Sequence, residues 1–378
     1  VKGISLFIVP KFHVDENGNP GERNGVSLAG LIHKLGYRGT TSTALSFGDD
    51  APCHGYLVGE PHQGLKYMFQ MMNEARIGVG FGAAVIGYRG YMHSLEYAKD
   101  RLQGRKASEK NPESPQVPII DHADVRRMLL AQKAYSEGGL ALCLYGARLM
   151  DDQHTHPDEQ KRMEAGKLLD LLTPVIKAWP SEYGPKANDL AIQVYGGAGY
   201  TREYPVEQCW RDNRLNPIHE GTNGIQALDL LGRKIWQDQS HGLQLLMQEM
   251  QVDLQAATTD RCQQWALSLR ETLQQAVKVT QSLGKSLMGG EVDKTLANAS
   301  CYLHLFGHII VAWMWLRQAN AAANALASAN SDSERNFYQG KLQAAQYFFH
   351  WELPTVAQDL VLLRNQDDTC LNMKADWF

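Results

Sequence analysis

The period of the apolar and polar positions changes near residue 60. Before that point, short apolar runs such as Ile4 to Val9 and Thr43 to Phe47 are separated by a turn-forming stretch from Asn17 to Gly21. Runs of about 4–8 residues bounded by Gly, Pro and Asn are typical of strands and their turns. Residues 1–60 are therefore expected to be β-rich, and because the chain opens directly on such a run, we expect them to be the end of an incomplete β domain.

From residue 61 onward the apolar positions follow the repeat of an α-helix. Asp121 is placed to cap one of these helices through its side chain. The glycines at 196, 197 and 199 follow a second predicted helix, and their position is explained by a glycine cap at the C-terminus of that helix. The predicted helices cover about 63–101, 121–150, 157–179, 184–195 and 223–236.

A polar joint at 237–240 separates these helices from residues 241–378. Beyond the joint, five residues repeat at the spacing of one helix face, and apolar stretches at 301–316 and 340–363 predict further bundle helices. The stripe consists of Trp265, Leu269, Leu273, Ala276 and Thr280. We therefore expect a mainly α fold with three parts: a partial β domain at 1–60, a four-helix domain at 61–238 and a separate helical bundle at 241–378.

Composition excludes several classes of function. The formal net charge of −4 without a Lys- or Arg-rich block gives no electrostatic footprint for nucleic acid or anionic lipid. The apolar run 309–316 is shorter than the about 20 residues of a membrane span, so a buried helix is expected. Six cysteines without a CxxC pair predict neither a disulfide framework nor a zinc site, and fit reduced thiols in the cytoplasm.

His304 and His308 share a helix face at the spacing of metal ligands. They lack the intervening Glu of a zincin motif and lie in an apolar run. We therefore expect buried, hydrogen-bonded histidines and no metal site.

The densest group of chemically distinctive residues lies between Gln193 and Gln226. In it, Glu220 precedes Gly221 and Thr222 just ahead of a predicted helix, whose free amides and Thr222 hydroxyl can bind an anion such as a pyrophosphate. From the pattern alone, Glu220 is better explained as a solvated residue near a helix N-terminus than as a catalytic carboxylate beside a bound anion.

Family resemblance changes this balance. The chain resembles the acyl-CoA dehydrogenases over about residues 1–235, because several of their motifs occur here in the same order and at comparable spacing. Residues from 241 resemble the extra C-terminal helical domain of a larger bacterial subgroup. The matching strings are KLGYRGTTSTALSF (34–47), VGEPHQGL (58–65), NEARIGVGFGAAVIGYRGYMHSLEYAKDR (73–101), QVYGGAGYTREYPVE (193–207), RD (211–212) and HEGTNGIQ (219–226).

The resemblance implies an FAD-dependent oxidoreductase of fatty acid β-oxidation. Such enzymes convert an acyl-CoA thioester to trans-2-enoyl-CoA, and Glu220 matches the base that removes the α-proton while hydride passes to flavin N5. Arg76 matches an arginine that faces this carboxylate. Asn73, His219 and Gly221 match positions at the substrate.

The same resemblance implies how FAD is held. Gln193 and Gly197 match positions that receive the adenine end of FAD from a neighbouring subunit, so a dimer or larger homo-oligomer is implied. His122 aligns with a histidine near the cofactor, although an ordinary surface residue also explains it. The matched cofactor positions are Arg101, Leu102, Gln103, His122, Gln193, Gly196, Gly197, Thr222 and Gly224.

Departures from the family pattern leave alternatives open. His219 stands where the family usually has Tyr, Asn73 where it has Asp, and Gly224 where it has Gln, so acyl specificity and FAD affinity are not fixed by the resemblance. The family implies an electron-transfer flavoprotein as the electron acceptor. The competing interpretations are an acyl-CoA oxidase, which uses oxygen, and a non-catalytic helical fragment that only mediates contacts.

Overall fold

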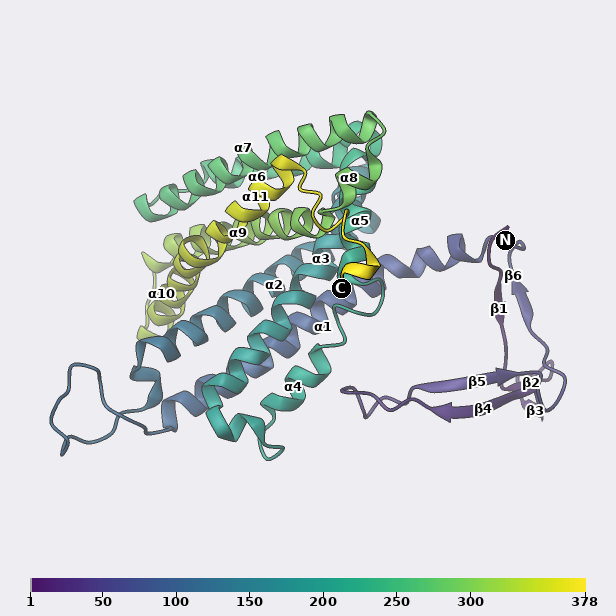
Figure 1. The fold of residues 1–378 in the computed structure, drawn as a ribbon, viewed down its shortest axis with the longest axis horizontal. Helices are drawn as coiled ribbons and strands as arrows, with labels where there is room; N and C mark the ends of the chain where they lie inside the picture. Colours follow the sequence, from purple (N-terminus) through teal and green to yellow (C-terminus); the bar gives the residue numbers. More distant parts are fainter. Residues whose placement is uncertain (1) are drawn as a thin grey trace. The chain divides into compact units, whose positions relative to one another are not determined.

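A computed structural model describes residues 2–378, with the side chains of Gln70 and Asn73 excepted. The predicted substrate contact of Asn73 therefore lies outside the described residues. Contacts divide the chain into two compact units, Val1–Ala75 and Arg76–Phe378, and the division falls inside helix α1 (Gly64–Asp100). The fold is mainly α with a small β part, which confirms the predicted fold class (Figure 1).

The first unit contains three antiparallel two-stranded sheets. Asn24, which is 1% exposed, joins their connecting segments: its Nδ2 donates to the carbonyls of Pro10 and His54, and its Oδ1 accepts from the amide of His54. The strand residues themselves are exposed or half-buried, as expected for strand pairs too small to enclose a core. The pairs are β1 (Leu6–Ile8) with β6 (Tyr56–Val58), β2 (Phe12–Val14) with β3 (Pro20–Arg23), and β4 (Val26–Leu31) with β5 (Thr43–Phe47).

The second unit begins with the rest of α1 and continues through helices that pack on one another. The longest contact is between α2 and α3, which run side by side. The helices are α2 (Ala123–Thr155), α3 (Glu159–Tyr195), α4 (Val206–Asn213) and α5 (Asn223–Gly232), with short 3-10 turns η1 (Ile119–Asp121) and η2 (Gly196–Tyr200).

Two local predictions in this region are wrong. Asp121 does not cap α2, whose N-cap is His122 without a side-chain cap; the Asp121 carboxylate accepts instead from Arg126 Nη2 at 3.0 Å. The predicted break between 179 and 184 is absent, because α3 continues through Pro174, Pro180 and Pro185. An interior proline costs about 3 kcal/mol. Since α3 is buried on nearly all sides over this stretch, packing outweighs the local preference.

Residues 241–378 form a second set of helices around α9. This helix contacts α2, α3 and α5 as well as its own neighbours α6, α7, α10 and α11. By length and composition α9 could cross a membrane, but 78% of its most apolar window is buried inside the protein. The elements are η3 (Lys234–Ser240), α6 (His241–Gln255), α7 (Asp260–Met288), α8 (Val292–Leu296), α9 (Ala299–Leu326), α10 (Asp332–Tyr347), η4 (Phe348–Glu352), η5 (Leu353–Thr355), α11 (Val356–Asn365) and η6 (Ala375–Trp377).

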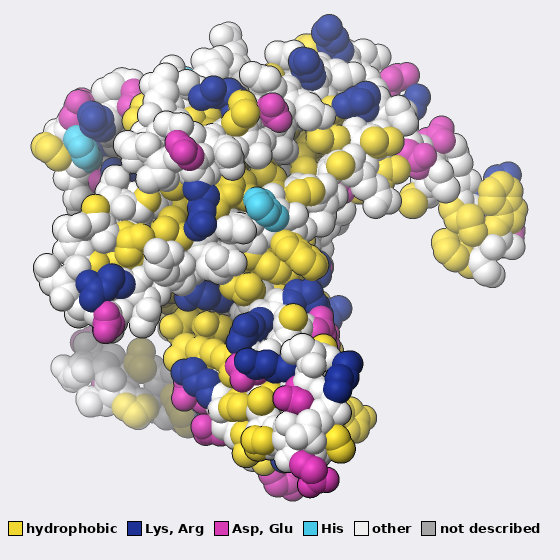
Figure 2. Space-filling model, turned by 90° about the vertical axis from the view of Figure 1, so that its left-hand side faces the viewer, with side chains coloured by type: hydrophobic (Ala, Val, Ile, Leu, Met, Phe, Trp, Pro, Cys, Tyr) yellow, Lys and Arg dark blue, Asp and Glu magenta, His cyan; other side chains and the backbone are white. Residues whose placement is uncertain are grey.

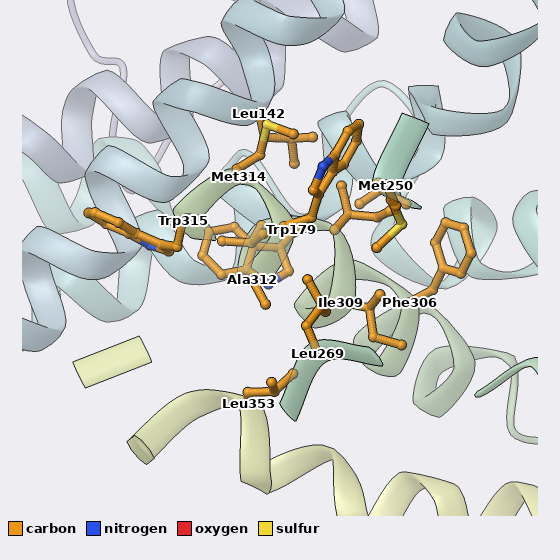
Figure 3. Close-up of a cluster of buried hydrophobic side chains, with 14 of the residues drawn as sticks. Leu142, Trp179, Met250, Leu269, Phe306, Ile309, Ala312, Met314, Trp315 and Leu353 are labelled. Atoms are coloured by element: carbon orange, nitrogen blue, oxygen red, sulfur yellow. The ribbon is translucent and has the colours of Figure 1, made fainter. Parts of the chain in front are cut away.

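One hydrophobic core joins both sets of helices. Figure 3 shows Leu142 and Trp179, from α2 and α3, in the same cluster as Leu269 and Trp315, from α7 and α9. The predicted stripe on α7 is buried in this core, as its spacing required. On the face drawn in Figure 2, basic and acidic side chains are interspersed. The small net charge therefore does not arise on this face from one large basic patch that offsets one large acidic patch.

The two histidines of α9 are hydrogen-bonded, as predicted, but only His308 is buried and His304 is half-buried. His304 contacts the Tyr183 hydroxyl through Nε2 at 2.8 Å and the Asp359 carboxylate through Nδ1 at 2.5 Å. His308 is fully buried; its Nδ1 lies 3.1 Å from the His304 carbonyl, and its Nε2 has no partner among the described residues.

The burial of His308 predicts a pH dependence of stability. Burial and then the neighbouring His304 lower the pKa of His308 well below its ordinary 6.5. Below pH 6.5 the unfolded chain therefore takes up a proton that the folded protein does not. The free energy of unfolding then falls by about 1.4 kcal/mol per pH unit from this group.

Replacement of His308 by Asn should remove that contribution. Denaturant unfolding from about pH 7 to pH 5 would measure it as a shrinking difference between wild type and His308→Asn as pH falls. His93 and His219, whose pKa values are also lowered, titrate in both proteins and cancel in the difference. A difference that stays constant with pH would contradict the prediction.

Candidate functional site

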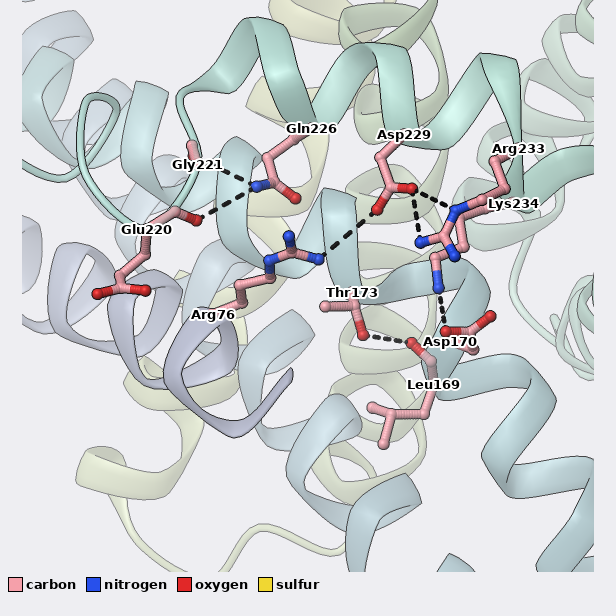
Figure 4. Close-up of polar contacts among 10 residues, drawn as sticks. All are labelled: Arg76, Leu169, Asp170, Thr173, Glu220, Gly221, Gln226, Asp229, Arg233 and Lys234. Carbon is pink, nitrogen blue, oxygen red and sulfur yellow. Dashed lines mark hydrogen bonds and ion pairs between the residues drawn. The ribbon is translucent and has the colours of Figure 1, made fainter. Parts of the chain in front are cut away.

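The loop from 214 to 222, between α4 and α5, presents Glu220. Helix α5 begins after Thr222, whose hydroxyl accepts from the Ile225 amide at 3.4 Å. Glu220 has a φ of 53°, a left-handed conformation that costs about 1–2 kcal/mol for a residue with a Cβ. Gln226, fully buried on α5, stabilises it: its Nε2 donates to the carbonyls of Gly221 at 3.2 Å and Glu220 at 3.4 Å (Figure 4).

The Glu220 side chain is exposed and available. Within residues 2–378 its carboxylate makes no hydrogen bond or ion pair, and its backbone amide donates to no backbone carbonyl. In Figure 4 the carboxylate points away from α5. A free carboxylate beside a free amide can remove a proton and stabilise the oxygen on which negative charge then develops.

Arg76 approaches this loop from α1. Its guanidinium lies between Glu220 and Asp229 in Figure 4, and its ion pair goes to Asp229, with Nη1 3.6 Å from Oδ2. The other oxygen of Asp229 accepts from Arg233 Nε at 2.8 Å. Arg76 is 7% exposed and its Nε has no partner in the described part of the chain. The sequence predicts Arg76 opposite the base; the structure gives it Asp229 as its ion-pair partner.

Two further polar residues lie close to Glu220, one beneath the loop and one within it. Lys177 of α3 is fully buried and donates to the carbonyl of Asn216 at 2.8 Å. His219 is half-buried, and its Nε2 lies 3.1 Å from Asn216 Oδ1. Burial, and then the charge of Lys177, lower the pKa of His219. Lys177 lies outside the sequence motifs, and its signal in the sequence is that it is the one cation within the apolar stretch 171–180.

A second group of predicted residues lies where α1 and α3 end. The two ends are joined by Tyr97 and Tyr195, whose rings stack 4.0 Å apart. Gly196 caps α3 at a φ of 61°, as its position predicted, and a Cβ added to Gly197 would meet no atom within 4 Å. At this end of the bundle lie Arg101, Leu102, Gln103, His122, Gln193, Gly196 and Gly197.

Within this second group, the His122 ring contacts the loop that follows α1. Its Nε2 lies 2.8 Å from the carbonyl oxygen of Gln103, and Leu102 pairs with Pro118 in a β-bridge. Arg101 directly follows α1, whereas Arg76 lies about a third of the way along it, so the helix separates the two arginines by about 37 Å at 1.5 Å per residue. The sequence-predicted residues therefore form two groups at distant points of α1.

Comparison with known proteins matches most of the chain. A family model described as acyl-CoA dehydrogenase, C-terminal domain, matches residues 62–236, and one described as acetyl-CoA dehydrogenase C-terminal like matches residues 246–374. The chain is 35% identical to the broad-specificity linear acyl-CoA dehydrogenase FadE5 of Mycobacterium tuberculosis, over 98% of this chain and 62% of that protein. It is also 35% identical to the 3-methylmercaptopropionyl-CoA dehydrogenase of Ruegeria pomeroyi, over 92% of this chain and 58% of that protein.

A solved structure shows the same fold. The acyl-CoA dehydrogenase of Bacillus anthracis, complexed with FAD, superposes with a TM-score of 0.70 at 20% identity, over 89% of this chain and 57% of that one. The chain thus spans about three fifths of the length of the proteins that it matches.

Proposed function

This chain belongs to the acyl-CoA dehydrogenase family, and from that membership we propose that it provides the base and much of the cofactor site of an FAD-dependent acyl-CoA dehydrogenase. The observation that carries the proposal is the presentation of Glu220. A free carboxylate stands beside a free amide, in a left-handed loop, two residues ahead of the N-cap of α5.

The residues around Glu220 fit the flavin half of FAD. At the start of α5 the Asn223 amide donates to the Pro217 carbonyl and the Ile225 amide to the Thr222 hydroxyl, which leaves the Gly224 amide and the proton of the Thr222 hydroxyl to hold an oxygen of the pyrophosphate. The unpartnered Arg76 Nε adds a buried donor nearby. When bound, FAD would supply the acceptor for the hydride that leaves the β-carbon.

The second group fits the adenine half of a cofactor. Gly197 leaves its backbone open, and Arg101 supplies a cation at the same end of the bundle. The two groups lie about 37 Å apart along α1. In line with the family resemblance, in which the adenine end of FAD is received from a neighbouring subunit, a chain would hold the flavin half of one FAD and the adenine half of another, which implies a homodimer at least.

The reaction assigned to this site is an α,β-dehydrogenation. Glu220 takes the α-proton of the acyl-CoA thioester, and the electron pair of that C–H bond forms the new C=C bond as the β-hydrogen leaves as hydride. The Glu220 amide donates to the thioester oxygen, where negative charge develops. Gln226 keeps the carbonyls of Glu220 and Gly221 in place, so that carboxylate and amide face the same substrate.

The remaining assignments follow from the same resemblance. We assign the electron acceptor as an electron-transfer flavoprotein and the location as cytoplasmic, which agrees with the six free cysteines. His219, adjacent to the base, is assigned to the wall of the acyl pocket.

Flavin spectroscopy tests the proposal directly. The purified protein is expected to carry FAD, to sediment as at least two chains, and to lose its visible flavin band when acyl-CoA is added without oxygen, with enoyl-CoA as product. A protein that takes up no added FAD, or whose flavin is not reduced by any acyl-CoA from short to long chain, would contradict it. Peroxide release in air at the rate of flavin reduction would instead identify an oxidase.

A further inference from the structure

Lys177 is a buried cation without an anionic partner. Its side chain is fully buried on α3, and among residues 2–378 no carboxylate lies within ion-pair distance of its Nζ. Its close contact is the carbonyl of Asn216, at 2.8 Å. A buried charge whose close contact is a neutral dipole is disfavoured, and the hydrogen bond to the Asn216 carbonyl offsets part of that cost.

Asn216 connects Lys177 to the loop that carries Glu220. Its Nδ2 donates to Asn213 Oδ1 at 2.7 Å, and its Oδ1 accepts from His219 Nε2 at 3.1 Å. Asn213 in turn donates to Asn188 Oδ1 at 2.7 Å. Because Asn188, Asn213 and Asn216 are all buried, this chain of amides fixes the start of the loop to α3.

The charged groups that face Lys177 come from two other elements. Arg76 lies on α1 and pairs with Asp229, and Glu220 and His219 lie on the loop. Burial, followed by the Arg76 charge, lowers the pKa of Lys177 to about 8, while Glu220 acts in the opposite direction. Lys177 is therefore an ammonium at neutral pH and becomes neutral in mildly alkaline solution.

We propose that Lys177 is a positioning residue for the base: its ammonium holds the Asn216 carbonyl, which keeps Glu220 in the left-handed conformation that faces the substrate. This inference rests on the proposed function of Glu220. A hydrogen bond from a charged donor is about twice as strong as one between neutral groups. Deprotonation of Lys177 therefore loosens the loop. As a result, kcat falls as the pH rises into the alkaline range, and this alkaline limb of the pH profile reports the loss of the Lys177 proton.

Replacement of Lys177 by Met, which keeps the length of the side chain, tests the role. At saturating acyl-CoA, kcat for Lys177→Met should fall about 100-fold, the effect of a small misplacement of a reacting group. KM and FAD content should stay close to wild type, and the alkaline limb should disappear. Lys186→Met, on the same helix but half-exposed, is the matched control and should keep both kcat and the limb. An unchanged kcat, or an alkaline limb that persists, would overturn the proposal.

Hydrogen exchange gives a readout that does not depend on catalysis. Without substrate, amides 214–222 should exchange faster in Lys177→Met than in wild type at neutral pH; equal rates would refute the positioning role. If Lys177→Met does not fold, the temperature dependence of the alkaline limb in the wild type is the test. The midpoint of the limb should move to lower pH on warming, because an ammonium group loses its proton more readily when warmed. A midpoint that does not move on warming would contradict the proposal. If acyl-CoA does not reduce the flavin of the wild type, the proposed function of Glu220 is refuted. The positioning role of Lys177 is then tested by the hydrogen exchange of amides 214–222 alone.

Discussion

Replacement of Glu220 by Gln is expected to slow flavin reduction by acyl-CoA by about 10²–10⁴-fold, the contribution of a positioned general base. Glutamine has nearly the same shape but cannot take up the α-proton. The loop should keep its conformation, because the bonds from Gln226 go to the carbonyls of residues 220 and 221 and not to the carboxylate. FAD should remain bound, since the start of α5 is unchanged.

Stopped-flow absorbance of the flavin band would measure this rate in the absence of oxygen. The matched control is Glu271→Gln, because Glu271 is an exposed glutamate on α7, outside the loop that carries Glu220. This variant should behave as wild type. FAD content distinguishes a lost base from a lost cofactor. Reduction of the flavin in Glu220→Gln at near the wild-type rate would show that another group is the base.

Replacement of Trp315 by Ala is expected to lower the free energy of unfolding by about 3–5 kcal/mol, the usual cost of truncating a large buried aromatic residue. Trp315 is fully buried on α9, and its Nε1 donates to the Ala134 carbonyl of α2 at 3.1 Å. A Cβ added to Gly138 would lie 2.7 Å from that nitrogen, so the indole fills a space shaped for it. The substitution leaves a cavity where the two sets of helices meet.

Denaturant unfolding followed by circular dichroism would measure this loss. Trp351→Ala removes a tryptophan that is 57% exposed and should change stability by no more than about 0.5 kcal/mol. Because residues on α2, α3, α7 and α9 share one core, the helical unit should still unfold in a single transition. A loss below about 1 kcal/mol for Trp315→Ala, which is typical of surface or weakly packed sites, would contradict close packing of Trp315 between α9 and α2.

The sequence was sufficient for those features that depend on local pattern. The helical repeat placed α1 within a residue or so of its observed ends, because a long apolar period is a strong local signal. The stripe on α7 and the glycine cap of α3 were also readable, since both reflect the geometry of one helix. The motif HEGTNGIQ located Glu220 ahead of α5, although only its resemblance to a family gave the carboxylate a role.

Packing between distant segments decided the rest. The continuity of α3 through Pro174, Pro180 and Pro185 depends on burial by other helices, which no local preference reports. The pairing of Arg76 with Asp229 likewise required α1 and α5 to meet. Lys177 lies beneath Glu220 because the fold packs α3 under the loop, which the sequence does not show. Hydrogen bonds and electrostatic interactions act between neighbours in space and not between neighbours along the chain.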